Sequence, residues 1–299
     1  MRYAMFSTAD DPTPRLAVLH AGGIADVQKL LARSDLAPRT VLELVQSGRD
    51  GWRRTAERLS ARFSEISVAG ATDVRWHAPI PRPLKNIVCL GLNYASHVRE
   101  TTRVDTPMKV PEIPVFFTKA STTASGPYDP IPWDTSATSQ VDYEAELGVI
   151  VGIGGKNIKR GTALDHVFGY TVINDVSARD LQFGHKQWFK GKSLDGFCPM
   201  GPVVVTSDEF GDSQKKRITL RVNGETRQAA STGDMLFPVN IILEYLSQGM
   251  TIEAGDIIAT GTPDGVGLGR TPPEYLKDGD VVETEIEGIG MLRNSVVRV

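Results

Sequence analysis

The most regular alternation of apolar and polar residues in the chain lies between Val141 and Val151. The odd positions carry apolar or aromatic residues throughout, and the even positions from 142 to 148 carry aspartate, two glutamates and glycine. Successive side chains of a strand point to opposite faces. The pattern therefore predicts a strand with Glu144 and Glu146 on one face and apolar side chains on the other. Exposed strands also carry acidic pairs, so this pattern alone leaves a surface strand equally possible.

The rest of the second half of the chain is also strand-like, because short apolar runs alternate with turns that contain glycine or proline. Asn223-Gly224 stands between two such runs and predicts a tight hairpin. Two stretches have helical spacing, at 177–185 and 238–247. The expected strands are 86–90, 115–118, 143–151, 167–173, 203–206, 218–222, 257–260 and 281–286. The pattern predicts an α+β fold that is mostly β.

The first 77 residues have a different pattern and predict a small α/β domain. Leu16 to Val18 is a short strand-like run, and residues 27–32, 40–46 and 52–63 have helical spacing. Residues 78–84 then hold three prolines, a composition that favours a stiff, extended connector. We therefore expect a small N-terminal domain at 1–77, a linker at 78–84 and a larger domain at 85–299.

Composition narrows the class of protein. The chain has 299 residues, of which 40% are hydrophobic and 23% charged, as in ordinary globular proteins. The net charge of −3 gives no reason to expect nucleic acid or an anionic membrane as a partner. No run reaches the roughly 18 apolar residues of a membrane helix, and the N-terminus lacks a secretory h-region. Cys89 and Cys198 form no CxxC motif, which favours buried thiols in a reducing compartment. We expect a cytoplasmic protein.

A third carboxylate, together with the two glutamates, would complete a set of metal ligands. Asp175 ends the apolar run that begins at Tyr170. If the ends of the two strands meet, Glu144, Glu146 and Asp175 converge without any histidine. Three oxygen ligands of this kind suit a hard divalent cation such as Mg²⁺.

The segment after Asp175 groups several polar residues. Ser177 to Asp180 fits a capping box with Ser177 as N-cap, which gives Asp180 a structural role. Arg179 and Gln182 are three residues apart on the expected helix and share a face. The sequence thus predicts a corner with several polar groups, although a polar surface turn would have the same composition.

Gly191-Lys192-Ser193 resembles the end of a phosphate-binding loop, but Lys186 stands where that motif needs its first glycine. Spacing therefore excludes a nucleotide site of this type. Near a bound substrate, Lys192 would stabilise a developing oxyanion or enolate. A surface lysine in a loop is the ordinary alternative.

His97 and Glu100 are three residues apart on a predicted helical turn and can meet on one face. A histidine–carboxylate pair is a suitable base near neutral pH, although exposed pairs of this kind are common. Residues 101–114 contain three prolines and no periodicity, which predicts a lid over a site. Farther along, Thr260-Gly261-Thr262 opens a glycine-rich turn whose amides and hydroxyls can hold a carboxylate, or simply form a tight turn.

These segments, taken in order, resemble the fumarylacetoacetate hydrolase family. The resemblance rests on Asn93 to Glu100, Asp142 to Val149, Asn174 to Gln182, Gly191 to Asp195 and Thr260 to Pro263. It covers about residue 85 to the C-terminus. The N-terminal domain is similar only to the small domain of long family members.

The resemblance implies a mixed β-sandwich roll, a homodimer and a site for Mg²⁺ or Mn²⁺, with Ca²⁺ possible in crystals. By position it implies metal ligands at Glu144, Glu146 and Asp175. It implies a water-activating dyad at His97 and Glu100, and catalytic help from Lys192. The remaining positions implied to bind substrate are Arg179, Gln182, Thr260, Gly261 and Thr262.

The function implied is hydrolysis of a C–C bond in an acylpyruvate or 1,3-diketo acid through a pyruvate enolate. Two alternatives use similar chemistry: decarboxylation of an oxaloacetate-type acid, and isomerisation of an unsaturated oxo-diacid. Hydrolysis of a 2,4-diketo-3-deoxy sugar acid is a further alternative. A non-catalytic metal-binding domain fits less well, because it would have no use for the dyad or for Lys192.

Overall fold

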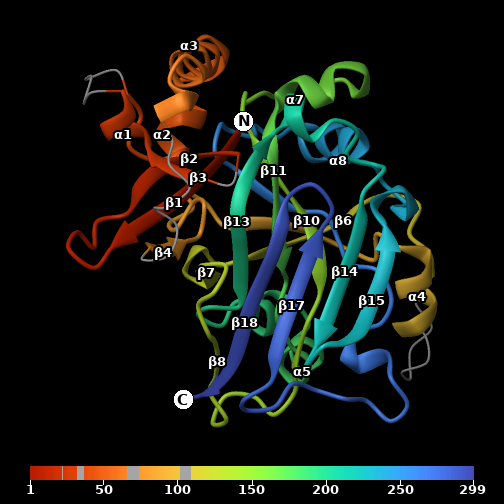
Figure 1. The fold of residues 1–299 in the computed structure, drawn as a ribbon. Helices are drawn as coiled ribbons and strands as arrows, with labels where there is room; N and C mark the ends of the chain where they lie inside the picture. The colour runs from red at the N-terminus through yellow and green to blue at the C-terminus, as the bar shows by residue number, and fades with distance from the viewer. Residues whose placement is uncertain (22, 32–36, 66–73, 102–108) are drawn as a thin grey trace.

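The computed structural model describes residues 1–21, 23–31, 37–65, 74–101 and 109–299. Within these ranges the chain forms a large sheet of eleven strands, a second sheet of five and a short two-stranded ribbon (Figure 1). The large sheet has the order β3 (Gly23–Asp26), β2 (Arg15–His20), β1 (Arg2–Thr8), β13 (Cys198–Thr206), β11 (Val167–Asn174), β10 (Ala145–Val151), β16 (Ile257–Ala259), β5 (Ile87–Gly91) and β6 (Val115–Lys119), with β4 (Val74–His77) beside β1 and β7 (Ala124–Ser125) beside β13.

The second sheet has the order β15 (Glu225–Ser231), β14 (Arg217–Val222), β17 (Val281–Ile286), β18 (Gly290–Arg298) and β8 (Ile131–Trp133), and the ribbon joins β9 (Val141–Asp142) to β12 (Ser177–Ala178). The helices are α1 (Val27–Leu30), α2 (Val41–Gln46), α3 (Gly48–Ser60), α4 (Ala95–Thr101), α5 (Arg179–Gly184), α6 (Phe189–Lys192), α7 (Ser207–Phe210) and α8 (Val239–Leu246). Short 3₁₀ helices lie at η1 (Phe63–Glu65), η3 (Ser121–Thr123), η4 (Arg160–His166), η5 (Thr232–Asp234) and η6 (Gly267–Gly269). The mostly β prediction with mixed sheets is confirmed.

The two sheets pack face to face, with β14, β17 and β18 lying over β10, β11 and β13 (Figure 1). Leu147 and Val172 from the large sheet and Leu220 and Leu292 from the small one are fully buried in the layer between them. Burial of each such side chain stabilises the fold by about 1.5–3 kcal/mol. This layer holds β10 and β11 rigidly, and the residues at the ends of these strands form the site described below.

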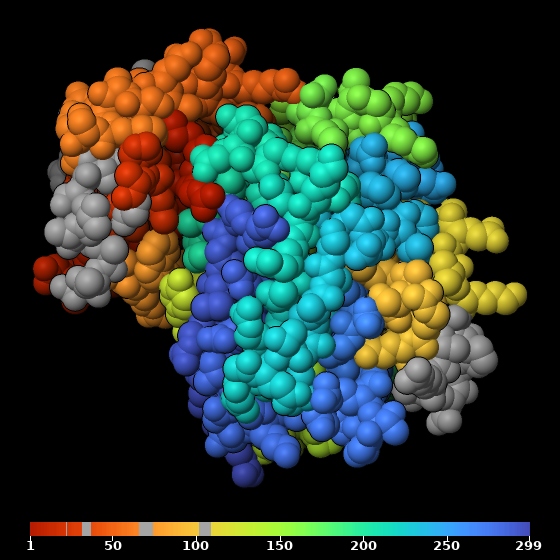
Figure 2. All heavy atoms as spheres, turned by 45° about the vertical axis from the view of Figure 1, so that its right-hand side comes forward, coloured from red at the N-terminus to blue at the C-terminus, as the bar shows by residue number. Residues whose placement is uncertain are grey.

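The N-terminal residues extend the large sheet, because β1 pairs with β13 through Arg2 opposite Val205. Helices α1 and α2 cover the far face of this sheet, where they contribute to a second apolar cluster that includes Ile150 and Phe168. The N-terminal strands and helices lie on the opposite side of the molecule from α4 (Figures 1 and 2). The sequence pattern did not predict β1, and the division at 78–84 remains a prediction.

Most of the predicted elements are present, with one difference at the start of α5. The hairpin at Asn223-Gly224 joins β14 to β15, and both residues have positive φ, as such a turn requires. The prediction of a capping box at Ser177 is wrong. Ser177 pairs with Asp142 in the ribbon and its hydroxyl donates to the carbonyl of Asp175, so α5 begins only at Arg179.

Asp180 is structural, as predicted, but its carboxylate accepts hydrogen bonds from the hydroxyl of Thr138 and the amides of Ser139 and Leu181. The two cysteines, both within the described residues, are buried and form no disulfide. No helix in the described ranges is long and apolar enough to cross a membrane.

Candidate active site

The strand predicted over Val141 to Val151 is interrupted at Tyr143 and Glu144, between β9 and β10. At this break the amide of Glu144 donates to the side-chain carbonyl of Asn174 at 3.0 Å. The amide of Asp175 donates to the carbonyl of Glu144 at 2.8 Å. These two bonds bring the end of β11 against the start of β10, which places Asp175 beside the two glutamates.

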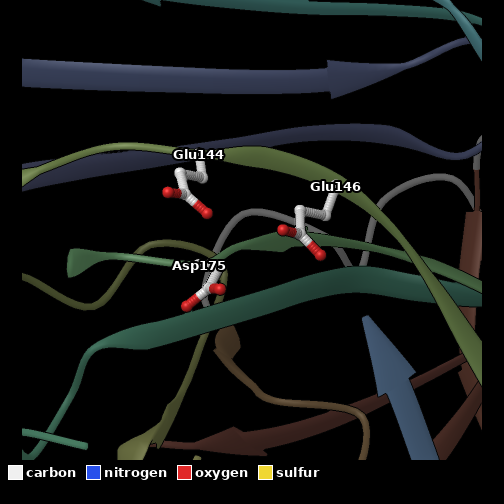
Figure 3. Close-up of side chains that lie close together, drawn as sticks. All are labelled: Glu144, Glu146 and Asp175. Carbon is white, nitrogen blue, oxygen red and sulfur yellow. The ribbon is translucent and has the colours of Figure 1, made fainter. Parts of the chain in front are cut away.

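The carboxylates of Glu144, Glu146 and Asp175 therefore gather in one place (Figure 3). One oxygen of each lies within 4.8 Å of an oxygen of the others, and all three residues are buried. We call this group the three-carboxylate cluster. The convergence predicted from the strand pattern is thus present in the structure.

Three buried cations surround the three-carboxylate cluster. The ammonium of Lys192 donates to Glu144 Oε2 and Asp175 Oδ2, both at 2.7 Å. Lys119 donates to Asp175 Oδ1 at 2.5 Å and to the carbonyl of Val176 at 3.0 Å. Arg179 Nη1 lies 2.7 Å from Glu144 Oε1. Buried charges of this density are stable only when paired, and here the pairing is almost complete.

The two glutamates differ in electrostatic environment. Burial and the nearby carboxylates of Asp175 and Glu144 raise the pKa of Glu146 well above its usual value. Burial also acts to raise the pKa of Glu144, but the cations of Lys192 and Arg179 outweigh it and lower that pKa to about 2. Glu146 is therefore the carboxylate whose negative charge is least compensated by the protein.

The residues of the cluster fit a divalent metal ion. Glu146 Oε2 accepts a hydrogen bond from the amide of Gly261 at 2.8 Å, whereas its Oε1 is buried and has no partner among the described residues. A buried carboxylate oxygen without a partner is costly unless a cation binds it. Because all of the donors are carboxylate oxygens, the site suits hard ions such as Mg²⁺ or Mn²⁺.

His97 and Glu100 meet as predicted on α4, with His97 Nδ1 lying 3.5 Å from Glu100 Oε2. The glycine-rich turn, residues 261–269, holds Glu100 from the other side. The amide of Gly265 donates to both oxygens of Glu100 at 3.0 and 3.1 Å. A Cβ at Gly269 would lie 2.1 Å from the Glu100 side chain, so only glycine permits this approach. The turn thereby fixes the dyad.

Some of the predicted residues line a cavity of about 30 Å³, enough for a water-sized group, whereas Glu100, Glu146, Asp175, Thr260 and Gly261 do not line it. Of the residues singled out in the sequence, the cavity brings together His97, Glu144, Arg179, Gln182, Lys192 and Thr262. Its apolar wall includes Leu90, Phe117, Trp188 and Leu268. Of the predicted lid, residues 102–108 lie outside the described part of the chain.

The amides of the glycine-rich turn bind carboxylates of the protein itself. The amide of Gly261 is bonded to Glu146, while those of Gly267 and Leu268 are bonded to Asp142 at 2.8 and 3.0 Å. Thr260 does not line the cavity, and its hydroxyl donates to the carbonyl of Leu147. The turn therefore shapes the site, and a role for its residues in binding substrate remains a prediction.

Sequence reasoning missed two members of this network, Lys119 and Asp142. Both are fully buried, and each is paired with a residue predicted to belong to the site. Lys119 ends the apolar strand β6 in the same way that Asp175 ends its own apolar run. A charged residue at the end of a buried strand was therefore an available signal.

Comparison with known proteins agrees with this geometry. Residues 86–297 match the model of the fumarylacetoacetate hydrolase C-terminal domain. The chain is 49% identical to the oxaloacetate tautomerase YisK of Bacillus subtilis, over 91% of this chain and 92% of that protein.

Two solved structures extend the comparison. A fumarylacetoacetate hydrolase from Exiguobacterium antarcticum is 42% identical with a TM-score of 0.81, and all of both chains is covered. A maleylpyruvate hydrolase from Sphingobium, solved with manganese(II) and pyruvate, is 29% identical with a TM-score of 0.78, covering 100% of this chain and 99% of that one. The manganese in that relative agrees with the donor set found here.

Proposed function

Because the chain belongs to the fumarylacetoacetate hydrolase family, we propose that it interconverts the keto and enol forms of oxaloacetate or a closely similar 2-oxo diacid. The observation that carries this proposal is the 49% identity, over nearly the whole of both chains, with an oxaloacetate tautomerase. The family and the buried acidic site identify an enzyme of metal-dependent type. The choice of reaction is the proposed part.

The three-carboxylate cluster would hold the metal ion. A bound divalent cation supplies Lewis-acid polarisation of the 2-oxo group of such a substrate. The donor set is all oxygen, and one oxygen of Glu146 lacks a partner among the described residues, so the protein is prepared for a cation at this position. The relative with bound manganese supports the same assignment.

Side chains around the cavity serve enolate chemistry. Arg179 Nη2 is buried and has no partner among the described residues, which leaves a donor for a substrate carboxylate. The ammonium of Lys192 lies at the cavity wall and stabilises negative charge on the oxygen as the enolate develops. The apolar wall keeps water from competing for these groups.

His97 would carry the proton. In the keto-to-enol direction it takes a proton from C3, the C3–H electron pair becomes the C2=C3 double bond, and the π electrons of the C2 carbonyl move onto its oxygen. The protonated imidazole then gives the same proton to that oxygen, so an O–H bond replaces a C–H bond and no water is consumed. Glu100 would orient the imidazole: its Oε2 lies 3.5 Å from Nδ1, which makes no hydrogen bond among the described residues, and Glu100 is itself held by the glycine-rich turn. General acid–base catalysis of this kind contributes about 10²–10⁴-fold.

The hydrolase expected from the sequence is the second candidate. It would use the same dyad to activate water, and the intact pair of His97 and Glu100 favours it, as does the likeness to a maleylpyruvate hydrolase. The comparisons nevertheless support the isomerase-type alternative better, because the relative at 49% identity is a tautomerase. Decarboxylation of oxaloacetate would need the same enolate and is an outcome of the test below.

The deciding experiment follows two signals from one enzyme sample with Mg²⁺ or Mn²⁺. Decay of the enol absorbance of oxaloacetate reports tautomerisation, and pyruvate release from oxaloacetate, acylpyruvates and fumarylpyruvate reports C–C cleavage. We expect the first signal to be much faster than the second. Rapid pyruvate release with no acceleration of the enol decay would replace the proposal by hydrolysis or decarboxylation.

Variants test the proton carrier in the same assay. His97→Ala should slow tautomerisation by about 10²–10⁴-fold. The matched control is His185→Ala, because His185 is exposed at the end of α5 and does not line the cavity. A cytoplasmic location and a homodimer are parts of the proposal that need separate tests.

A further inference from the structure

We infer that Asp142 is a positioning residue that fixes both the substrate-facing Arg179 and the glycine-rich turn behind the dyad. The inference rests on the proposed role of Arg179 in binding a substrate carboxylate. Asp142 does not line the cavity, and among the described residues its side chain makes no hydrogen bond to the three-carboxylate cluster, so its action is indirect.

Asp142 is fully buried, and its carboxylate accepts four hydrogen bonds. Oδ2 accepts from Arg179 Nε at 2.8 Å and from the amide of Leu268 at 3.0 Å. Oδ1 accepts from the amides of Gly267 and Tyr143, both at 2.8 Å. A carboxylate that holds four donors at these distances leaves them little freedom, since charge-assisted hydrogen bonds are the strong ones.

One of these four hydrogen bonds, from Nε, helps to orient Arg179. Asp142 binds the guanidinium at Nε, while Glu144 and the side-chain carbonyl of Gln182 bind it at Nη1, at 2.7 and 2.9 Å. Nη2 is left without a partner among the described residues. With Nε and Nη1 held, the direction of the remaining donor is set before any substrate arrives. This is preorganisation, which reduces the cost of ordering on binding.

Two others, from the amides of Gly267 and Leu268, hold the glycine-rich turn. Gly267 and Leu268 are bound to Asp142, and the next residue, Gly269, lies against the side chain of Glu100. A Cβ at Gly267 would lie 2.7 Å from Asp142 Oδ1 and 2.1 Å from the carbonyl of Glu274, so the turn approaches Asp142 as closely as only glycine allows. The buried carboxylate of Asp142 thereby connects Arg179 to the turn that holds Glu100 of the dyad.

The test measures the affinity for oxalate, a 2-oxo acid mimic, by calorimetry with saturating Mg²⁺. Asp142→Asn keeps the shape but offers an amide where Arg179 Nε needs an acceptor. We expect the Kd for oxalate to rise about 10- to 100-fold, as for the loss of one charge-assisted hydrogen bond. Asp180→Asn is the matched control, because Asp180 is the chain neighbour of Arg179 and its carboxylate bonds, within the part of the chain that the structure describes, to Thr138, Ser139 and Leu181 and not to Arg179.

A double-variant comparison separates positioning from general structural support. If Asp142 acts through Arg179, the variant with both Asp142→Asn and Arg179→Gln should bind oxalate no more than about twofold more weakly than Arg179→Gln by itself, since coupled sites are not additive. The inference would be overturned if the two single-variant losses of oxalate affinity multiplied in the double variant. It would also be overturned if Asp142→Asn bound oxalate as tightly as the wild type.

Gly267→Ala provides a second approach if Asp142→Asn does not fold. The added methyl meets Asp142 Oδ1, although Gly267 itself does not line the cavity. We expect oxalate binding to weaken several-fold, and unchanged binding would contradict the inference. Because oxalate affinity is measured apart from turnover, a wild-type enzyme that binds oxalate but does not tautomerise oxaloacetate would reject the proposed function and leave the role of Asp142 standing.

Discussion

Replacing Glu146 with glutamine removes one negative charge from the three-carboxylate cluster and hardly changes the size of the side chain. Glu146 is fully buried, and its only hydrogen bond among the described residues is from the amide of Gly261. A glutamine carbonyl can accept that bond. The substitution also relieves the repulsion from Glu144 and Asp175, so the metal-free protein should be at least as stable as the wild type.

Metal binding should change in the opposite direction. The variant keeps two of three charged ligands, and we expect its Kd for Mg²⁺ or Mn²⁺ to rise at least about 100-fold, equivalent to about 2.8 kcal/mol. At a metal concentration of 100 times the wild-type Kd, binding stabilises the wild type by about 2.7 kcal/mol. For a chain of this size that raises the melting temperature by roughly 4 °C. The same metal concentration should raise the melting temperature of Glu146→Gln by only about 1 °C.

Glu144→Gln is the informative comparison. That substitution also removes a ligand, but it leaves the buried cations of Lys192 and Arg179 without one of their partners. Breaking a buried pair in this way typically costs about 3–5 kcal/mol. Differential scanning calorimetry with and without metal should therefore show a lowered metal-free melting temperature for Glu144→Gln and not for Glu146→Gln. A full metal-induced shift in Glu146→Gln, or equal destabilisation by the two substitutions, would refute the reasoning.

Two further predictions rest on the structure, and a third, the dimer, rests on the family resemblance. Gly269→Ala places a methyl against Glu100 and should lower turnover about 10- to 100-fold, the effect of a disturbed general base, while calorimetry finds metal affinity unchanged; equal turnover would contradict the role of the turn. Burial and the cation of Arg75 lower the pKa of His77 in the folded protein. The contribution of neutral His77 to the stability of the fold is therefore complete above the pKa of about 6.5 that histidine has in the unfolded chain, and it is lost as the pH falls through the lower pKa of the folded state. Melting temperatures between pH 7 and 5 should then fall less for His77→Gln than for the wild type, and parallel curves would argue against this. Sedimentation at micromolar concentration should give a dimer, and a particle of 32.5 kDa would exclude it.

Local pattern was sufficient for the directions of side chains and for the turn types. Alternation predicted that Glu144 and Glu146 point the same way, because the two-residue repeat of a strand is set by backbone geometry alone. Both carboxylates do lie in the cluster, although Glu144 falls in the break before β10. The same holds for the hairpin at Asn223-Gly224, whose positive φ values are a property of those two residues. Such features depend on neighbours in the chain, so a single sequence carries them.

Partners distant in the chain were decided only by the tertiary structure. The break at Glu144, the pairing of Lys119 with Asp175, and the four hydrogen bonds to Asp142 join segments separated by up to 126 residues. The pairing of β1 with β13 likewise joins Arg2 to Val205. Periodicity says which way a side chain points from its own strand, but the choice of partner depends on how two sheets pack and which buried charges must then be compensated. That choice is made by the whole fold, because an uncompensated charge in its interior costs more than any local preference supplies.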